Sequence, residues 1–424
     1  MDTHPAPSRA AARACLAGFI ALVVAMGIGR FSFTPLLPLM QAAGQLDLAQ
    51  GSWLASANYL GYFVGALLAA RIAIEPRTLV RVGVMSIALL TAAMAWTDSF
   101  AGWLLLRAAS GVLSACVLVG TSAWCLAELS RAGKSAWAGM VYAGVGGGIA
   151  LAGLYCLGGV RLHAAPGALW MQLGLVAALC GGVVLLLAQR GPVAVAAVAT
   201  PVAAPASAAA SPAVIGADRS AGRAQPAQQP AQQRVLVTVY GIFGLGYILP
   251  ATFLPAMART VLDDPAVFGW AWPVFGAAAA LSTVLVATLF ARVDRVRLWI
   301  ACQLLMAVGT GLPGLMPSTA TVLASALLVG GTFMVVTMVG LQEARARGGA
   351  AATALLGSMT ASFALGQIIG PLGSALLGRI FGGDLLGMRV ALLLAAALLA
   401  ASALWLRHDN AKGYPSSTAS RATT

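Results

Sequence analysis

Apolar residues gather into twelve segments along the chain, and short polar stretches separate most of them. The segments lie near residues 15–40, 52–74, 79–98, 100–127, 135–159, 166–188, 235–258, 267–290, 298–316, 319–342, 351–378 and 385–406. A helix needs about 20 predominantly apolar residues to cross the hydrocarbon core of a bilayer. The pattern therefore predicts an all-α membrane protein with twelve transmembrane helices.

A longer stretch of different composition divides these segments into six and six. Residues 189–234 are rich in Ala, Pro, Gln and Ser and lack helical apolar periodicity, so we expect a disordered linker. The predicted organisation is an N-terminal tail at 1–14, a six-helix bundle at 15–188, the linker, a second six-helix bundle at 235–406 and a C-terminal tail at 407–424. The first apolar run is longer than that of a signal peptide, so we interpret it as a retained first span.

The stretch that opens the first half recurs at the start of the second. Residues 27–40 read GIGRFSFTPLLPLM, and residues 244–257 read GLGYILPATFLPAM. A constant shift of 217 superimposes Gly27, Gly29, Leu37, Pro38, Met40 and Trp53 on Gly244, Gly246, Leu254, Pro255, Met257 and Trp270. Chance similarity between apolar segments is the alternative, but the matched glycine and proline offsets favour duplication. Duplicated, interrupted helices are typical of transporters with two related halves, so we predict two pseudo-symmetric bundles.

Prolines interrupt both copies of this stretch. Pro35 and Pro38 cannot donate to the carbonyls of Phe31 and Thr34, so we expect a bent first helix with two freed carbonyls. We expect further helix bends at Pro250, Pro255 and Pro371.

Charge is scarce and unevenly distributed. The chain is 60% hydrophobic and 9% charged with a net charge of +13, whereas soluble proteins carry about 25% charged residues. With the N-terminus in the cytoplasm, nineteen Lys and Arg residues lie on the cytoplasmic side and four on the other. The positive-inside rule therefore predicts that both termini and the linker are cytoplasmic, and it explains the basic charge without a nucleic-acid partner.

Two arginines remain within spans. Arg30 lies midway along the first span, where an unshielded cation costs about 2.5–3.5 kcal/mol on insertion scales, so it needs a polar cavity, a partner or a ligand. Arg107 lies about two turns inside the outer end of the fourth span, from where it can partly snorkel. Together they favour an anion between the bundles; the alternative is that each arginine bonds freed carbonyls to hold a bend.

Other polar and aromatic residues complete a candidate substrate site. In the second span Asn58 and Tyr62, four apart, share a helix face, either for bonds between helices or to line a cavity. We expect the first, fourth, seventh and tenth spans to line the site. The candidate substrate-binding residues are Arg30, Asn58, Tyr59, Tyr62, Arg107, Tyr142, Tyr247, Thr332, Phe333 and Gln367.

The acidic residues avoid the middle of the spans. Glu128 and Glu343 lie at the cytoplasmic ends of the fourth and tenth spans. We expect them to pair with Arg71, Arg77 or Arg295 as a gating latch, with an ordinary surface salt bridge as the alternative. A cation exporter usually needs a buried carboxylate, so cationic drugs are disfavoured as substrates.

Glycines and cysteines point to packing and not to chemistry. Gly61 and Gly65 form a small-xxx-small pair for close helix contact, and the glycines of the fifth span suit helices that slide past each other. Those glycines lack the strand and the Lys-Ser/Thr of a phosphate-binding loop. The six cysteines lie within apolar runs without ligand-like spacing, so we expect no metal and no cofactor.

These motifs resemble the major facilitator superfamily, specifically its YbfB/YjiJ-type bacterial members. The resemblance is carried by GIGRFSFTPLLPLM, ANYLGYFVGALLAA, YAGVGGGIAL, GLGYILPATFLPAMAR, GGTFMVVTM and TASFALGQIIGP, and it covers nearly the whole chain except the tails and the linker. It implies the major facilitator fold and a secondary transporter of the bacterial inner membrane, without indicating a substrate. Arg107 with Gly111 is similar to the superfamily's arginine-glycine motif, which is often associated with proton coupling. Ala-Ala-Arg at 69–71 replaces the expected Asp-Arg, which puts a standard gating salt bridge there in doubt.

The combined expectation is a monomeric, proton-linked carrier that moves a small organic anion or weakly polar amphiphile by alternating access. Without a buried carboxylate or histidine, the substrate's own acid group would carry the proton. Efflux of hydrophobic toxic compounds is an alternative that the exporter-like eleventh span favours. A membrane sensor or assembly factor that keeps the fold without transport is an alternative of another class. An enzyme is not expected, because no Ser/His pair, paired carboxylates or metal cluster is embedded.

Overall fold

Twelve helical crossings make up the part of the chain that the computed structural model describes, residues 7–71, 74–134, 137–189, 230–261, 269–288, 293–348 and 352–413. The first crossing consists of α1 (Pro7–Leu22), a π-helix η1 (Val23–Ile28) and α2 (Phe33–Ala42). The other eleven are α3 (Leu48–Arg71), α4 (Pro76–Ala93), α5 (Phe100–Arg131), α6 (Ala138–Arg161), α7 (Pro166–Leu187), α8 (Pro230–Val261), α10 (Ala271–Thr288), α11 (Arg295–Leu315), α12 (Thr319–Gly348), α13 (Ala352–Ile380) and α14 (Asp384–Gly413).

These helices are long and apolar enough for a multi-pass membrane protein. Ten described stretches meet the length and hydropathy of a membrane span, and a shorter apolar helix occupies Ala271–Val286. Helix α3 adds a further crossing of 24 residues. The expected linker falls largely on 190–229, outside the described residues, as do positions 1–6 and 414–424 of the tails.

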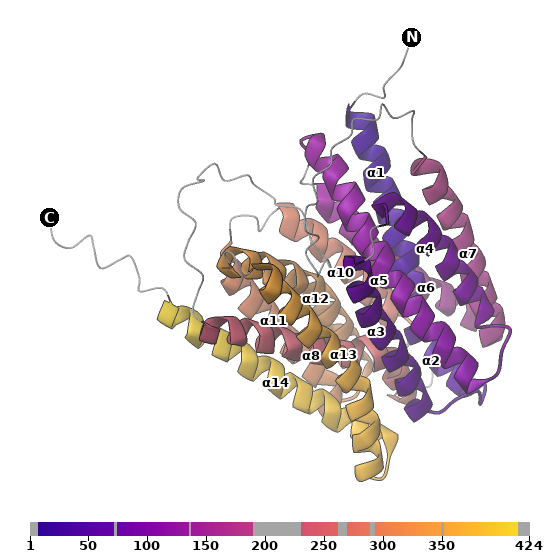
Figure 1. The fold of residues 1–424 in the computed structure, drawn as a ribbon. Helices are drawn as coiled ribbons and strands as arrows, with labels where there is room; N and C mark the ends of the chain where they lie inside the picture. Colours follow the sequence, from indigo (N-terminus) through magenta and orange to yellow (C-terminus); the bar gives the residue numbers. More distant parts are fainter. Residues whose placement is uncertain are drawn as a thin grey trace.

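The helices form two bundles of six crossings, which Figure 1 shows side by side, from indigo to magenta for the first and from rose-red through orange to yellow for the second. Corresponding helices make corresponding contacts in the two bundles. The pairs α3–α5, α4–α5, α4–α7 and α1–α6 of the first bundle match α10–α12, α11–α12, α11–α14 and α8–α13 of the second. This agreement confirms the predicted pair of pseudo-symmetric bundles.

Contacts between the bundles run along three helix pairs, α6–α10, α3–α13 and α2–α8. The first pair packs backbone to backbone, since a Cβ on Gly146 would lie 2.3 Å from the backbone nitrogen of Ala280 and one on Gly276 would lie 2.2 Å from that of Ala150. In the third pair the Thr34 hydroxyl donates to the Ala251 carbonyl at 2.8 Å. These two residues are 217 positions apart, which is the shift that relates the two sequence copies.

The first crossing is interrupted at its centre. In η1 the N–H of Gly29 donates to the carbonyl of Val24 and that of Phe31 to the carbonyl of Met26, both over five residues. A turn at 29–32 follows before α2 begins. A single π-type segment inside an α-helix is a recognised cause of a local break, frequently near functional sites.

The prediction that Pro35 frees the carbonyl of Phe31 was wrong. The carbonyl of Phe31 accepts from the N–H of Thr34 at 3.3 Å, and Pro35 lies in the first turn of α2, where no intrahelical acceptor is needed. The π-helix moves the break upstream, where the carbonyls of Gly29 and Arg30 accept from Arg107, and those of Ala25 and Ile28 accept from Ser114 and Ser32. The second copy is not broken: α8 continues through Pro250 and Pro255, as α13 does through Pro371.

Candidate functional site

Arg30 occupies the turn that interrupts the first crossing, and its side chain is buried, with 2% of its surface exposed. One terminal nitrogen donates to the Gln367 Oε1 atom at 2.7 Å. The guanidinium lies over the ring of Tyr62 at 4.0 Å and at 5.2 Å from the ring of Tyr59. Its Nε atom is buried without a hydrogen-bond partner among the described residues. Arg30 therefore has a buried donor that no described residue uses.

Gln367 of α13 joins the two halves at this point. Its Oε1 atom accepts from Arg30, and its Nε2 atom donates to the hydroxyl of Tyr247 on α8. Tyr247 is 217 positions after Arg30 and so is its counterpart in the second copy. The side-chain amide of Gln367 therefore bonds to both related positions, of which Arg30 is charged and Tyr247 is not.

A cavity of about 50 Å³ lies beside this arginine. That volume holds on the order of four water molecules. The lining side chains come from both bundles and are Met26, Arg30, Phe31, Tyr62, Leu118, Tyr142, Val145, Tyr240, Tyr247, Phe333, Met334, Thr337, Thr360 and Phe363. Met26 precedes Arg30 in its crossing, and Tyr142 and Tyr240 lie near the starts of α6 and α8. The cavity therefore lies on the side of Arg30 that faces the N-terminal ends of α1, α6 and α8.

Aromatic rings form the cavity wall opposite Arg30. The ring of Tyr247 is stacked on Phe333 at 5.4 Å between centroids and on Phe363 at 5.6 Å, with interplanar angles of 2° and 7°. Tyr240 and Phe243 pack against the same group, each 5.3 Å from Phe363. Offset rings at such distances stabilise one another and keep the wall rigid.

Arg107 of α5 does not line this cavity. Its terminal nitrogens donate to the carbonyl oxygens of Gly29 at 3.1 Å and of Arg30 at 2.9 Å. Ser110 also donates to the Gly29 carbonyl, at 2.8 Å. This is the arrangement expected under the alternative in which an arginine holds a helix bend through freed carbonyls. Asn58 in turn donates to the backbone carbonyl of Arg107 at 2.9 Å and lies outside the lining set.

Hydrogen bonds join the bundles on the other side of Arg30. The Tyr59 hydroxyl lies 2.8 Å from the Thr252 hydroxyl, and Ser56 donates to the Ile368 carbonyl at 3.2 Å. With the Thr34 bond already described, these contacts connect α2 and α3 to α8 and α13. The bundles are thus held together on the side away from the cavity.

The remaining sequence candidates divide between the wall and the helix interiors. Tyr142 lines the cavity, and its hydroxyl lies 2.8 Å from that of Ser122. Phe333 lines it too, whereas the hydroxyl of Thr332 bonds to the Leu328 carbonyl of its own helix at 2.6 Å. Sequence reasoning missed most of the wall, namely Met26, Phe31, Leu118, Val145, Tyr240, Met334, Thr337, Thr360 and Phe363. The spacing of Tyr240, Phe243 and Tyr247 by three and four residues was the available signal, since it places three rings on one helix face.

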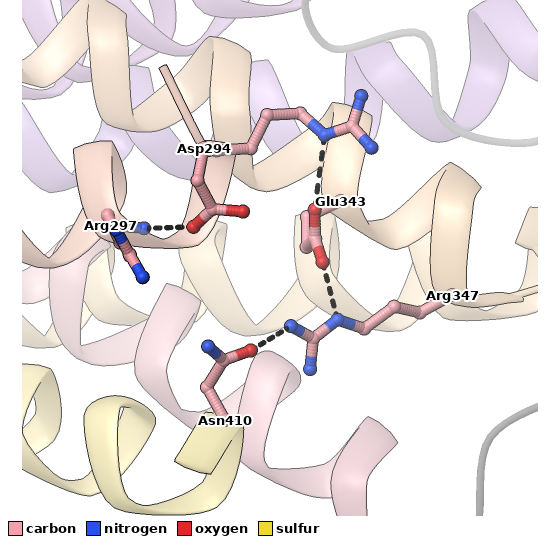
Figure 2. Close-up of polar contacts among 6 residues, drawn as sticks. Asp294, Arg297, Glu343, Arg347 and Asn410 are labelled. Atoms are coloured by element: carbon pink, nitrogen blue, oxygen red, sulfur yellow. Dashed lines mark hydrogen bonds and ion pairs between the residues drawn. The ribbon is translucent and has the colours of Figure 1, made fainter. Parts of the chain in front are cut away.

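Both predicted gating carboxylates form ion pairs. Glu128 accepts from Arg77 and from Arg131, each at 2.6 Å. Glu343 accepts from Arg295 at 3.2 Å and from Arg347 at 2.5 Å, and Arg347 also donates to Asn410 (Figure 2). Every pair lies within one bundle, so in this conformation they join α4 to α5 and α11 to α12. The side chain of Arg71 lies outside the described residues.

The described residues include no group of three or more His, Cys, Asp or Glu side chains that could hold a metal ion. The chemistry of the site therefore consists of one guanidinium, an amide, several hydroxyls and an aromatic wall. Such a set can bind a ligand and orient it.

Comparison with known proteins gives the family. The profile of a family described as "Uncharacterised MFS-type transporter YbfB" matches residues 22–407. No curated protein sequence matches the chain. A crystal structure of a point variant of the nucleoside transporter NupG is similar, with a TM-score of 0.70 and 11% identity, over 94% of this chain and 99% of that one.

A second similar structure is a bacterial homologue of the human lysosomal transporter Spinster, crystallised in an inward-facing, unoccupied conformation. Its TM-score is 0.67 at 13% identity, over 98% of this chain and 100% of that one. At these identities the two structures establish the fold, and the profile match establishes the family. The chain belongs to the YbfB-type family of major facilitator superfamily transporters.

Proposed function

We propose that this transporter moves a small organic anion, or a weakly polar amphiphile with an acidic group, and that Arg30 binds the acidic group. One observation carries the proposal: a guanidinium 2% exposed lines a central cavity with its Nε atom unpartnered among the described residues. A buried cation without a counter-charge is costly, and an anionic ligand offsets that cost. No described lining residue is Asp, Glu or His.

The proposed transport cycle follows from where the bundles touch. If the N-terminus is cytoplasmic, as the basic residues indicate, the cavity lies on the cytoplasmic side and the bonds of Tyr59, Thr34 and Ser56 close the outer side. Breaking those bonds while the bundles rock about α6–α10 would expose Arg30 to the other side. We place the protein in the bacterial inner membrane as a monomer.

Proton linkage is part of the proposal. Because the described lining contains no side chain that titrates near neutral pH, we propose that the proton travels on the substrate's acid group, which pairs with Arg30 in its ionised form and takes up the proton before the bundles move. Uptake of such a substrate would change the internal pH of proteoliposomes, which an enclosed pH-sensitive dye reports.

The gating proposal concerns Glu128 and Glu343. Each carboxylate pairs with two arginines. These ion pairs lie at the end of each bundle that also contains the N-terminal ends of α1, α6 and α8. We propose that they keep these helix ends aligned while the bundles move, with Arg77 and Arg295 as their partners across helices.

The test is flux through purified protein in proteoliposomes. Arg30→Ala should abolish movement of the transported anion and leave membrane insertion intact. A matched control is Arg81→Ala, which removes an exposed arginine of α4 outside the cavity. Full transport by Arg30→Ala would reject the role of Arg30.

Efflux of hydrophobic compounds is the second candidate, and the aromatic wall of Tyr247, Phe333 and Phe363 favours it. Drug-susceptibility profiling of a deletion strain separates the two: hypersensitivity to uncharged lipophilic compounds supports efflux. Absence of flux for every compound would instead support a sensor or assembly factor.

A further inference from the structure

The free donors of Arg30 limit the chemistry of the acidic group. One terminal nitrogen is committed to Gln367, while the buried Nε atom has no partner among the described residues. The terminal nitrogen with an N–H parallel to that of Nε is Nη2, which has two hydrogens and donates to Gln367. With its second hydrogen, Nη2 and Nε together match the two oxygens of a carboxylate. A carboxylate bound in this way lies in the plane of the guanidinium.

Charge balance limits the ligand further. Arg30 is the single charged side chain among the described residues that line the cavity. Arg107 adds no donor to the lining, because it lies outside the lining set and its terminal nitrogens donate to the carbonyls of Gly29 and Arg30; its Nε atom is buried without a partner among the described residues. A second carboxylate, or a phosphate monoester with nearly two charges, would therefore find no second cation in the described lining, and burying that extra charge is costly. An ammonium group would likewise find no carboxylate.

The walls favour a flat ligand. The guanidinium carbon lies 4.0 Å from the centroid of the Tyr62 ring, which lines the cavity, so a carboxylate bound to Arg30 lies near this ring. The rings of Tyr247, Phe333 and Phe363, nearly parallel to one another, line the same cavity. A ring conjugated to its carboxylate stays coplanar with it and can meet these rings in offset or edge-to-face contact.

We infer that the cavity selects monocarboxylates whose acid group is attached directly to an aromatic ring, over alicyclic acids, dicarboxylates and zwitterions. The inference rests on the proposed anion transport and names the substrate class of the same site. Benzoate is the simplest probe of this class.

The test compares ligands that differ in one property each. Dissociation constants are measured by titration calorimetry on the full-length protein in lipid nanodiscs. Cyclohexanecarboxylate has the size and charge of benzoate without its π-system, so benzoate should bind about three- to tenfold tighter. Benzamide lacks the charge, terephthalate doubles it, and phenylalanine and trimethylglycine add a cation. Each of these should bind at least about tenfold weaker than benzoate.

Variants of the wall connect the preference to particular rings. Phe333→Leu and Phe363→Leu should each lower the ratio of benzoate to cyclohexanecarboxylate affinity toward one, with little change for cyclohexanecarboxylate. Phe243→Leu is the matched control, since Phe243 belongs to the same ring cluster but does not line the cavity. It should keep the wild-type ratio. Thermal unfolding of each variant establishes that it is folded.

The possible outcomes separate this inference from the function on which it rests. Equal or tighter binding of cyclohexanecarboxylate to the wild type overturns the aromatic preference. Arg30-dependent binding of terephthalate, phenylalanine or trimethylglycine tighter than benzoate overturns the monocarboxylate class but keeps anion transport. A complete lack of Arg30-dependent binding by any organic anion overturns both.

Discussion

The double replacement of Arg107 and Ser110 tests whether Arg107 holds the broken first crossing or binds substrate. Two donors reach the Gly29 carbonyl, Arg107 at 3.1 Å and Ser110 at 2.8 Å, whereas among the described side chains Arg107 donates to the Arg30 carbonyl at 2.9 Å. A buried acceptor that loses its last partner costs about 1–3 kcal/mol. A carbonyl that keeps one of two donors loses less.

These contacts predict a non-additive result. Ser110→Ala alone should lower the free energy of unfolding by less than about 1 kcal/mol, because Arg107 still serves the Gly29 carbonyl. Arg107→Leu orphans the Arg30 carbonyl and should cost about 1–3 kcal/mol, partly offset because a buried charge is removed. In the Arg107→Leu background, Ser110→Ala also removes the last side-chain donor to the Gly29 carbonyl. The free energy of unfolding that Ser110→Ala removes should then be larger than in the wild type by about 1 kcal/mol or more.

The assay is a double-mutant cycle of reversible unfolding in mixed detergent and lipid micelles, with anion binding measured on all four proteins. Additive effects within about 0.5 kcal/mol would show that the two side chains do not share an acceptor. An Arg107→Leu protein with unchanged stability and no anion binding would place Arg107 in the binding site and refute the structural role.

Three further predictions concern the interfaces and the ion pairs. Tyr59→Phe removes the hydrogen bond to Thr252 and should shift the population toward conformations open on the outer side. Spin labels at Ala43 and Leu385 should then be farther apart; an unchanged distribution of label distances would contradict this. Glu343→Gln leaves Arg347, which is 8% exposed, without its counter-charge. It should lower the unfolding midpoint more than Glu128→Gln, because the side chain of Arg131, a partner of Glu128, is 67% exposed. Equal shifts would show that burial of the arginine does not determine the loss of stability. Gly146→Ala would place a Cβ 2.3 Å from the backbone of Ala280 and should abolish transport, whereas Gly158→Ala in the same helix meets nothing within 4 Å and should be neutral, as flux in proteoliposomes measures.

The number of crossings and their division into two halves followed from the sequence because each depends on local composition. Length and hydropathy define a span without knowledge of its neighbours, and the duplicated stretch at a shift of 217 indicates the symmetry. Arg30 was recognisable for the same reason, since a cation in the middle of an apolar segment contrasts with its surroundings. The pairs Glu128–Arg77 and Glu343–Arg295 followed from their places at the same ends of neighbouring helices.

The direction in which side chains point could not be predicted in the same way. In a membrane helix both the lipid-facing and the buried sides are apolar, so hydropathy does not distinguish them. Phe363 therefore gave no sign that it lines a cavity, and Tyr240 gave one only through its spacing from Phe243 and Tyr247. The sequence left two roles open for Arg107, a polar lining shared with Arg30 or a bond to freed carbonyls, and the proline positions placed those carbonyls elsewhere. The π-helix η1 moves those carbonyls to Gly29 and Arg30, where they meet Arg107.

The measurement that tests the central claim most directly is the thermal stabilisation of purified protein by organic anions, compared between the wild type and Arg30→Gln. A ligand that binds the folded state raises its unfolding temperature in proportion to occupancy. We predict that at least one monocarboxylate gives a saturable increase in the wild type and none in Arg30→Gln, while the unliganded variant remains folded. An equal, saturable increase in both proteins would contradict the assignment of Arg30 as the anion-binding group.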